Sequence, residues 1–326
     1  MKLRIEREQW PYRVPFRIAR GVNGSLGVIV VTLFDDAGNM GRGEAAGIEY
    51  DGETNASMEA QIEAVRPSLE KDISRTQLAE LLPAGGARNA VDCALWDLEA
   101  KATGIVAWTR AGYTNLHPVP TCATIGIGSA AEVLAAARHL SNWPRLKVKV
   151  DATHHLDAVR TVRTVCPNAA LIIDANQSWT CGLLNHLAPE LHTLGVQLIE
   201  QPVMRADQSS LRGYLGAIPL AADESCGDRT SLEPLVGLYQ AVNIKLDKAG
   251  GLTEALAMAI AARRLGLLIM VGCMAGTSLA MAPAIVVAQE ADFVDLDGPL
   301  LHRCDREHAI RYHAGMAYPP DRELWG

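Results

Sequence analysis

The chain has 326 residues, of which 49% are hydrophobic and 21% charged, a balance typical of a soluble globular protein. Its formal net charge of −7 at pH 7 argues against a nucleic-acid-binding surface. The first ten residues are charged and contain no apolar leader, and the longest apolar stretch, residues 278–288, is too short to cross a bilayer. The seven cysteines show no paired spacing, which predicts reduced thiols in a cytoplasmic protein. With the charge and the short apolar stretch, no nucleic-acid or membrane partner is expected.

The N-terminal third combines strand patterns with helix patterns. Residues 1–50 are predicted to form strands separated by a turn, and the pattern becomes helical from about residue 55 to 70. Residues 87–103 predict an amphipathic helix, because their apolar positions share one stripe and a glycine follows. Strands followed by helices indicate a separate α+β domain, expected over residues 1–117.

Short apolar runs then alternate with helical patterns from residue 118 to 298. Eight runs are candidate strands: 119–125, 146–150, 170–174, 196–200, 218–222, 241–246, 267–272 and 292–296. Of the helical patterns between them, residues 252–266 give the best. Eight strands in this rhythm predict an α/β barrel rather than a doubly wound sheet. The tail, residues 299–326, is expected to pack back on the first domain.

A charged residue stands at or near the end of each of five consecutive candidate strands. The five are Lys149, Asp174, Glu200, Asp223 and Lys245, separated by 22 to 26 residues. Because the C-terminal ends of barrel strands meet at one rim, we expect these side chains to converge. Any one of the carboxylates alone could be a helix cap, since Asp is favoured there, but three at consecutive strand ends favour a shared site.

This set of groups predicts a particular chemistry. Three carboxylates that converge without His or Cys form an oxygen site, which suits Mg²⁺ better than zinc. A lysine on each side could act as a base on one face of a ligand and as an acid on the other. A divalent ion between them would stabilise a negatively charged oxygen formed when a proton leaves carbon. The pattern therefore predicts proton abstraction next to a carboxylate group.

Two further lysines compete for roles in this site. Lys147 lies two residues before Lys149, so the two share a strand face, and the apolar residues that alternate with them place that face inside the barrel. Two neighbouring ammonium groups are expected to lower each other's pKa toward that of a general base. Lys245 has a rival in Lys248, and we favour Lys245 because it ends the strand run whereas Lys248 lies in the loop.

Other residues near predicted strand ends leave two interpretations open. Asp295 and Asp297 precede Gly-Pro, so they form either a turn or a paired anionic pocket for an ammonium group. Arg20 lies in a Gly-rich segment and could bind a carboxylate over the barrel mouth if a loop of the first domain reaches there. The Gly-rich segment 272–280 carries no further phosphate signal, so we interpret it as pocket wall.

Together these motifs resemble the enolase superfamily, specifically its muconate-lactonizing subgroup. KVKV, DANQSW, EQP, ADES and NIKLDKAGG follow that family's order and spacing over nearly the whole chain. The resemblance implies a modified (β/α)7β TIM-like barrel under an α+β capping domain, which is built from the N-terminal region and the C-terminal tail. It also implies an essential Mg²⁺ and an enolate intermediate. The implied roles are metal ligands for Asp174, Glu200 and Asp223, acid and base for Lys149 and Lys245, and an auxiliary role for Lys147.

Within the subgroup, the motif Asp295-x-Asp297 resembles that of the dipeptide epimerases, where it binds the substrate's N-terminal ammonium group. Arg20 matches a loop arginine that binds a glutamate side chain in some of these enzymes. The pocket is implied to be lined by Thr124, Cys273 and Ala275, where Cys273 departs from the Ser of some members. The resemblance thus implies an isomerase that inverts the α-carbon of a dipeptide's C-terminal residue, in murein-peptide recycling.

Three alternatives remain open at this point. A lyase or cycloisomerase of the same subgroup, such as an o-succinylbenzoate synthase, would use the same metal and lysines but gives no reason for the Asp pair. An N-acylamino-acid racemase would follow if that pair binds no ammonium group. A non-catalytic small-molecule binding protein on this scaffold would not need two lysines across a metal. The expected partner is a small dipeptide substrate, with a possible homo-oligomer.

Overall fold

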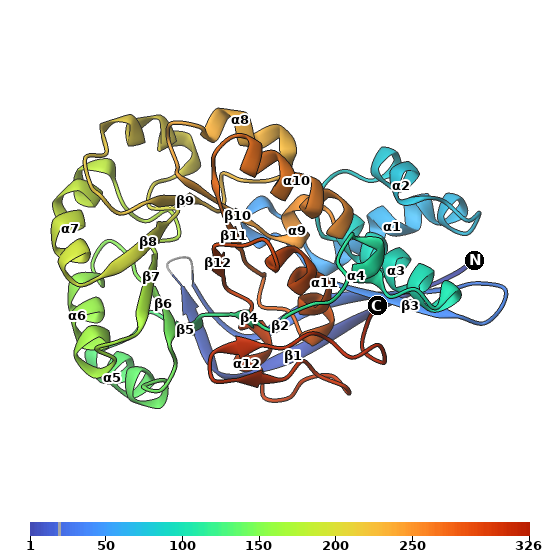
Figure 1. Cartoon of the computed structure of the whole chain (residues 1–326), viewed down its shortest axis with the longest axis horizontal. Coiled ribbons are helices and arrows are strands. Elements are labelled where there is room, and N and C mark those ends of the chain that lie inside the picture. Colours follow the sequence, from blue (N-terminus) through green and yellow to red (C-terminus); the bar gives the residue numbers. More distant parts are fainter. Residues whose placement is uncertain (19–20) are drawn as a thin grey trace.

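The computed structural model describes residues 1–18 and 21–326, and its two parts lie side by side along the long axis (Figure 1). One part is an antiparallel sheet with helices packed on it, and the other is a curled parallel sheet surrounded by helices. Arg20, a predicted substrate-binding residue, lies outside the described residues. Within the described ranges, no helix is both long and apolar enough to cross a membrane.

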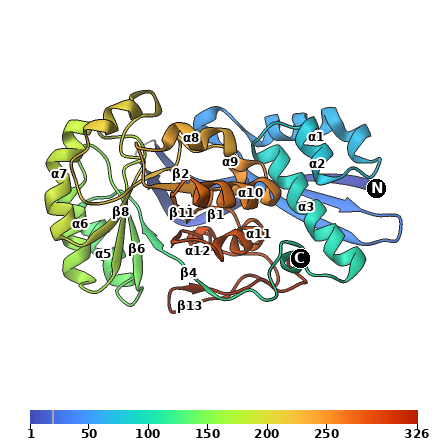
Figure 2. The same ribbon diagram turned by 45° about the horizontal axis from the view of Figure 1, so that its top comes forward.

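The N-terminal sheet has three antiparallel strands in the order β1-β2-β3. They are β1 (Lys2–Ile18), β2 (Gly21–Phe34) and β3 (Met40–Ala46). The β-branched run of β2 is buried, as expected for residues that favour a pleated, covered surface. β1 and β2 form a long hairpin that extends toward the barrel in both views (Figures 1 and 2). The backbone oxygen of Arg17 accepts a hydrogen bond from Ile127 N (3.2 Å), which ties this hairpin to the loop after the first barrel strand.

Helices cover this sheet and confirm the predicted helical patterns. They are η1 (Glu49–Asp51), α1 (Asn55–Leu69), α2 (Arg75–Leu81), α3 (Gly86–Thr103) and α4 (Ala107–Arg110). α1 and α2 each begin with a capping box, which satisfies amide groups of the first turn. α3 packs closely on β3 because Gly43 has no side chain: a Cβ there would lie 2.1 Å from Ala90 O.

The second part is an eight-stranded parallel sheet whose strands follow one another in chain order. Its strands are β5 (Ala123–Ile125), β6 (Arg145–Lys149), β7 (Ala170–Asp174), β8 (Val196–Glu200), β9 (Leu220–Ala222), β10 (Ala241–Ile244), β11 (Leu268–Val271) and β12 (Phe293–Val294). Cys122 N donates to Val294 O (3.0 Å) between the first and last strands, so the sheet closes. The predicted modified (β/α)7β barrel with a capping domain is confirmed.

Helices fill the connections between these strands. They are α5 (Ala130–His139), α6 (Leu156–Val165), α7 (Cys181–Thr193), η2 (Arg205–Gly213), η3 (Arg229–Ser231), α8 (Leu232–Leu235), α9 (Leu246–Ala249), α10 (Leu252–Arg264) and α11 (Ser278–Ala288). After β8 the connection is a 3-10 helix rather than an α-helix. Its sequence is polar and buries only Leu211, so it lacks the apolar stripe that would hold a full helix on the sheet.

One predicted strand is divided in the structure. The run 119–125 forms two strands. Between them, Thr121 N donates to Gly315 O (2.9 Å), so the chain at this point is bonded to the tail rather than to a barrel strand. β4 (Val119–Pro120) pairs with β14 (Met316–Ala317) of the tail, and β14 pairs with β13 (Tyr312–His313), whereas β5 enters the barrel.

The tail contacts both parts of the molecule. Besides its pairing with β4, it ends against α3, where Trp325 Nε1 donates to Cys93 O (3.0 Å) and Gly326 N donates to Asp97 Oδ1 (2.7 Å). The two parts also meet directly: Asp247, after β10, accepts from Ala46 N (3.0 Å) and from Asn89 Nδ2 (3.1 Å). These bonds fix the capping part over the barrel.

The barrel interior changes character along its axis. A small apolar cluster fills the end at which the strands begin: Cys122, Ile172, Leu198, Ala221, Ala241 and Met270. Two residues further along the same strands, Ile172 is followed by Asp174, Leu198 by Glu200 and Ala221 by Asp223. Because side chains two residues apart share a strand face, this alternation turns an apolar floor into a charged rim.

Candidate active site

The predicted charged residues meet at one rim of the barrel. Lys149 pairs with Asp174, and Asp174 pairs with Glu200, in the registers of β6, β7 and β8. Asp223 follows β9 directly and Lys245 follows β10 directly. The three carboxylates are buried, at 0–1% exposure. The regular spacing in the sequence therefore reflects five neighbouring strands that end at the same height.

The two lysines of β6 occupy different places in this rim. Lys147 Nζ lies 3.0 Å from Asp174 Oδ2, 2.7 Å from Glu200 Oε2 and 2.7 Å from Asp295 Oδ2, and its side chain is fully buried. Lys149 Nζ lies 2.6 Å from Asp174 Oδ2 and is partly exposed. Both point into the barrel, as their apolar neighbours predict, but only Lys149 reaches the open side.

The carboxylates around Lys147 act against the lowering of its pKa that was expected beside a second lysine and a metal. Burial alone would lower the pKa of Lys147, and a neighbouring ammonium group was expected to lower it too. The carboxylates of Asp174, Asp295 and Glu200 outweigh burial and raise the pKa of Lys147 well above its usual value. The sequence could not reveal this effect, because Asp295 follows β12 and lies 148 residues from Lys147 in the chain.

On the other side of the rim, Asp223 holds two lysines. Lys245 Nζ lies 2.7 Å from Asp223 Oδ2, and Lys248 Nζ lies 2.7 Å from Asp223 Oδ1. Lys248 also donates to the backbone oxygens of Asp223 and Asn243, so its donors are used within the barrel wall. Burial would raise the pKa of Asp223, but the two ammonium groups lower it well below its usual value. Lys245 has fewer fixed contacts, which agrees with the preference for it over Lys248.

The pKa values of Glu200 and Asp174 are shifted in opposite directions. Burial, and then the charge of Asp174, raises the pKa of Glu200 to about 8. Burial has the same tendency at Asp174, but Lys147 and Lys149 outweigh it and lower the pKa of Asp174. Negative charge is therefore in excess near Glu200, where another cation would be stabilising.

The donor chemistry of this rim fits a divalent oxygen-binding ion. Five carboxylates face four ammonium groups here: Asp174, Glu200, Asp223, Asp295 and Asp297 against Lys147, Lys149, Lys245 and Lys248. Among the described residues, no three acidic, His or Cys side chains are grouped as they would be around a metal ion. The Lys147 ammonium group contacts both Asp174 (3.0 Å) and Glu200 (2.7 Å). The residues that would hold the ion are Asp174, Glu200 and Asp223.

The pair Asp295 and Asp297 is buried beside this rim. Asp297 Oδ2 accepts from Thr124 N (2.6 Å), while Asp295 binds Lys147. Burial, and then the charge of Asp295, raises the pKa of Asp297 to about 7. The Asp297 side chain forms no cap bond to the short helix α12 (Gly298–Leu301) that follows it. The chain does turn here, since Leu300 N donates to Asp297 O (2.9 Å), but the turn does not use the Asp297 carboxylate, which an ammonium group of a ligand would neutralise.

The segment after β11 lies next to this pair. Burial, followed by the charges of Asp295 and Asp297, raises the pKa of Cys273 to about 12. Ala275 adopts a left-handed backbone conformation, with φ of 61°. Thr124 N donates to Asp297, and Ala275 lies against Gly298, the residue after Asp297, where an added Cβ would be 3.0 Å from Ala275 Cα. Arg20 lies outside the described residues.

Sequence analysis missed several residues that shape the rim. Asn243 Nδ2 donates to Glu200 Oε1 (2.8 Å), and Asn176 Oδ1 lies 3.2 Å from Lys149 Nζ. Gln201 Oε1 accepts from Asp223 N (2.9 Å) and orients that residue's backbone. One of them carried a signal, because Asn243 lies in β10 two residues before Lys245 and so shares its strand face. Asn176 lies beyond the end of β7, with a φ of 43°, so strand alternation could not place it.

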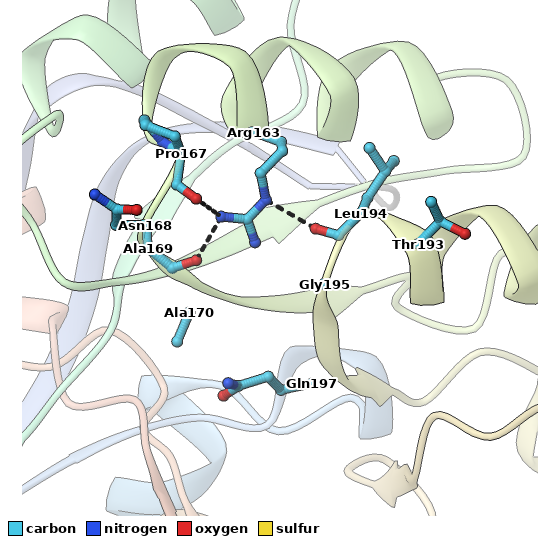
Figure 3. Close-up of a pocket in the computed structure, with 9 residues that line it drawn as sticks. All are labelled: Arg163, Pro167, Asn168, Ala169, Ala170, Thr193, Leu194, Gly195 and Gln197. Carbon is cyan, nitrogen blue, oxygen red and sulfur yellow. Dashed lines mark hydrogen bonds between the residues drawn. The ribbon is translucent and has the colours of Figure 1, made fainter.

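A cavity of about 440 Å³ lies at the opposite end of the barrel strands (Figure 3). It is lined by Arg163 and by the starts of β7 and β8, including Ala170 and Gln197. The guanidinium group of Arg163 donates hydrogen bonds to backbone oxygens, among them Leu194 O (2.8 Å) and Ala169 O (2.8 Å). This cavity therefore offers no chemistry comparable to that of the rim, which we take as the candidate active site.

The barrel, the capping domain and the opposed lysines define a member of the enolase superfamily. Residues 1–109 match the mandelate racemase/muconate lactonizing enzyme N-terminal domain, and residues 129–323 match the enolase C-terminal domain-like family. The chain belongs to the mandelate racemase/muconate lactonizing enzyme family of that superfamily.

Two relatives and two solved structures are similar over most of the chain. An L-Ala-D/L-Glu epimerase of Escherichia coli is 42% identical over 96% of this chain and 98% of its own. An N-acetyl-D-glutamate racemase of Pseudoalteromonas is 40% identical over 79% and 82%. An Agrobacterium tumefaciens enolase family member with bound sodium and L-Ala-L-Glu superposes with a TM-score of 0.97, 38% identity and 99% coverage of both chains. A Methylococcus capsulatus dipeptide epimerase with Mg and L-Arg-D-Lys has a TM-score of 0.92 and 30% identity, covering 100% of this chain and 99% of its own.

Proposed function

We propose that this protein is a Mg²⁺-dependent dipeptide epimerase of the L-Ala-D/L-Glu type, an isomerase that inverts the α-carbon of the C-terminal residue. The observation that carries the proposal is the placement of Lys149 and Lys245. β6 and β10 are four strands apart in a closed ring of eight, so their lysines face each other across the barrel mouth. A planar intermediate between them can lose a proton on one face and gain one on the other.

The proposed roles follow from the chemistry of each group. One of the two lysines, in its neutral form, accepts the α-proton, and the other, protonated, returns a proton to the opposite face. When bound by Asp174, Glu200 and Asp223, Mg²⁺ supplies positive charge that neutralises the substrate carboxylate and the enediolate charge developing on it. Lys147 acts as an auxiliary cation that orients Asp174 and Glu200.

Substrate selection is assigned to a second group of residues. Asp295 and Asp297 bind the dipeptide's N-terminal ammonium group, because the Lys147 ammonium group pairs with Asp295 of the two, and two buried carboxylates are stabilised by a second cation. Thr124, Cys273 and Ala275 line the pocket around them. Arg20 binds an acidic side chain of the second residue, which stays a prediction because that residue lies outside the described ones. The likeness to enzymes named for L-Ala-D/L-Glu and to a structure that holds L-Ala-L-Glu supports this substrate class.

The wider setting is part of the same proposal. We assign residues 1–117 to the capping domain, 118–298 to the barrel and 299–326 to a segment that packs on the cap. Unpaired thiols at all seven cysteines agree with a cytoplasmic location, where recycled murein peptides would be the substrates. A homo-oligomer stays a prediction.

A racemase of N-acylamino acids is the second candidate, and the 40% identity to an N-acetyl-D-glutamate racemase favours it. It would place a neutral acyl group against Asp295 and Asp297, which argues against it. A lyase of the subgroup meets the same objection, and a binding protein would not need the opposed lysines.

Deuterium exchange tests the proposal directly. The protein is incubated in D₂O with Mg²⁺ and either L-Ala-L-Glu or N-acetyl-L-glutamate, and α-deuterium is followed by NMR. Exchange and inversion of L-Ala-L-Glu at a rate well above that of the acetylated amino acid are expected. Faster exchange of N-acetyl-L-glutamate would favour the racemase, and no exchange in either would favour a binding protein.

A further inference from the structure

His302 is a fully buried histidine directly after α12, the short helix that begins behind Asp297. Its Nε2 lies 2.7 Å from the backbone oxygen of Ala275. A carbonyl oxygen only accepts hydrogen bonds, so Nε2 carries the proton in this contact. Nδ1 is buried and finds no hydrogen-bond partner within the described part of the chain. Packing alone would be served better by an apolar ring, because an unsatisfied buried nitrogen is destabilising.

The acceptor of this bond lies in the segment 272–276 between β11 and α11, which we call the pocket loop. Ala275 in its middle has a φ of 61°, a region that residues with side chains rarely adopt. On another side, the backbone of the loop rests on Gly298, where an added Cβ would lie 2.6 Å from Gly276 O. The conformation of the loop is thus imposed by its neighbours, and His302 supplies a directional bond to it.

The imidazole ring also contacts the capping domain. The ring of Tyr12, in β1, stacks on His302 with centroids 5.1 Å apart and planes inclined by 9°. The next residue, Arg303, donates from its backbone to Pro11 O (2.9 Å) and from Nε to Tyr12 O (3.1 Å). Figure 1 shows α12 beside β1, in agreement with these contacts.

We propose that His302 is a positioning residue for substrate binding, which sets the pocket loop against the β1–β2 hairpin of the cap. The inference rests on the proposed function, since it assigns the pocket loop to the dipeptide site. His302 contacts no group proposed to transfer a proton. Its loss therefore weakens binding of the dipeptide more than it slows the chemical step, which would appear in KM rather than in kcat.

The chain allows a matched pair of amide variants at this position. In His302→Gln, the amide nitrogen can occupy the place of Nε2 and still donate to Ala275 O. In His302→Asn, the same amide is one carbon shorter and cannot reach that oxygen. His192→Gln, an exposed histidine near the end of α7, serves as the control. His302→Phe, which keeps a flat ring on Tyr12, replaces His302→Asn if that variant does not fold.

Kinetics with L-Ala-L-Glu and Mg²⁺ give the first readout. We expect His302→Asn to raise KM about tenfold, the effect of losing one well-placed contact, with kcat within about threefold of wild type. His302→Gln should restore KM to within about threefold, and His192→Gln should leave it unchanged. A fall in kcat without a change in KM, or equal effects of Asn and Gln, would overturn the inference.

Thiol alkylation gives a second readout that needs no substrate. Iodoacetamide labelling of Cys273, mapped by mass spectrometry, should be at least fivefold faster in His302→Asn than in wild type or His302→Gln. Labelling of Cys93, a buried residue of α3 whose backbone oxygen bonds to Trp325 of the tail, reports general loosening and should not change. Faster labelling of both cysteines would mean a merely structural role and would overturn the inference. If the wild-type protein epimerised no dipeptide while Cys273 responded as expected, the proposed function would fail and the positioning of the loop would stand.

Discussion

Lys147 and Asp295 connect the two halves of the candidate active site, with 2.7 Å between the ammonium nitrogen and Oδ2 of the carboxylate. The same ammonium group contacts Asp174 and Glu200, the proposed metal ligands. One buried lysine thus lies between the carboxylates assigned to the metal and the pair assigned to the substrate's ammonium group. A change of charge in either half therefore changes the electrostatic potential at the other half.

The first prediction concerns the two opposed lysines. Lys149→Ala and Lys245→Ala should each lower kcat for L-Ala-L-Glu by about 10²–10⁴, the usual contribution of a general acid or base. Circular dichroism and Tm should show a folded protein, because Asp223 keeps Lys248 and Asp174 keeps Lys147 as partners. Lys71→Ala, at an exposed position, is the control. Near-normal turnover by folded Lys245→Ala would contradict the two-base mechanism, and Lys248 would be tested next.

The second prediction concerns the metal. Asp223→Asn replaces one of three ligand charges by a neutral amide, so Mg²⁺ affinity, measured by calorimetry, should fall at least about tenfold together with activity. The variant leaves Lys245 and Lys248 without their shared carboxylate, so its Tm must be measured alongside. EDTA should abolish activity of the wild-type protein, and added Mg²⁺ should restore it. Wild-type activity that resists EDTA would refute the metal requirement whatever the variant does.

Much of this site was predictable because the strands of a barrel follow one another in chain order and end at one rim, so residues at regular intervals in the sequence become neighbours. One charged residue at each of five strand ends, together with the apolar alternation around Lys147 and Lys149, was enough to place them at one rim. The pKa of Lys147 was not predictable, since Asp295, one of the carboxylates that raise it, comes close to Lys147 only when the barrel closes. The supporting roles of Gln201 and His302 were hidden for the same reason: their partners, Asp223 and Ala275, are distant in sequence.

In the fold, too, features set by neighbouring residues were predictable, and those set by residues distant in the sequence were not. The helix over residues 87–103 and the eight strand positions follow from periodicity, which neighbouring residues determine. The break between β4 and β5 depends on Gly315 in the tail, which no local pattern announces. The 3-10 helix after β8 was missed because a short polar segment between two strands was assumed to be an ordinary barrel helix.

The third prediction uses a buried carboxylate between the two parts of the molecule. Asp92 on α3 accepts hydrogen bonds from Thr253 N (2.9 Å) and Thr253 Oγ1 (2.6 Å), and burial raises its pKa to about 6. The folded state therefore binds more protons than the unfolded state between about pH 4 and pH 6. Through that window, ionisation of Asp92 lowers the free energy of unfolding by up to about 3 kcal/mol as pH rises.

Urea unfolding of wild type and Asp92→Asn at pH 4.5 and 7.5 measures this contribution. Because the amide does not titrate, the stability difference should move in favour of the variant at the higher pH. Asp36→Asn, at an exposed turn position, is the control for effects of net charge. A difference that is independent of pH, or that moves in favour of the wild type at pH 7.5, would show that Asp92 is already ionised at pH 4.5 in the folded protein.

The last prediction concerns specificity. Asp295 and Asp297 should select substrates with a free N-terminal ammonium group, because both are buried and burial with mutual repulsion raises the pKa of Asp297 to about 7. N-acetylation of L-Ala-L-Glu removes the positive charge and leaves Asp297 without a cation, since Lys147 already pairs with Asp295. Uncompensated buried charge costs several kcal/mol, so kcat/KM should fall by about a hundredfold or more. In parallel, Arg20→Ala should reduce kcat/KM for L-Ala-L-Glu far more than for L-Ala-L-Leu. Equal kcat/KM for the free and acetylated dipeptides would contradict the ammonium pocket and shift the choice toward the N-acylamino-acid racemase, with the metal and lysine assignments unchanged.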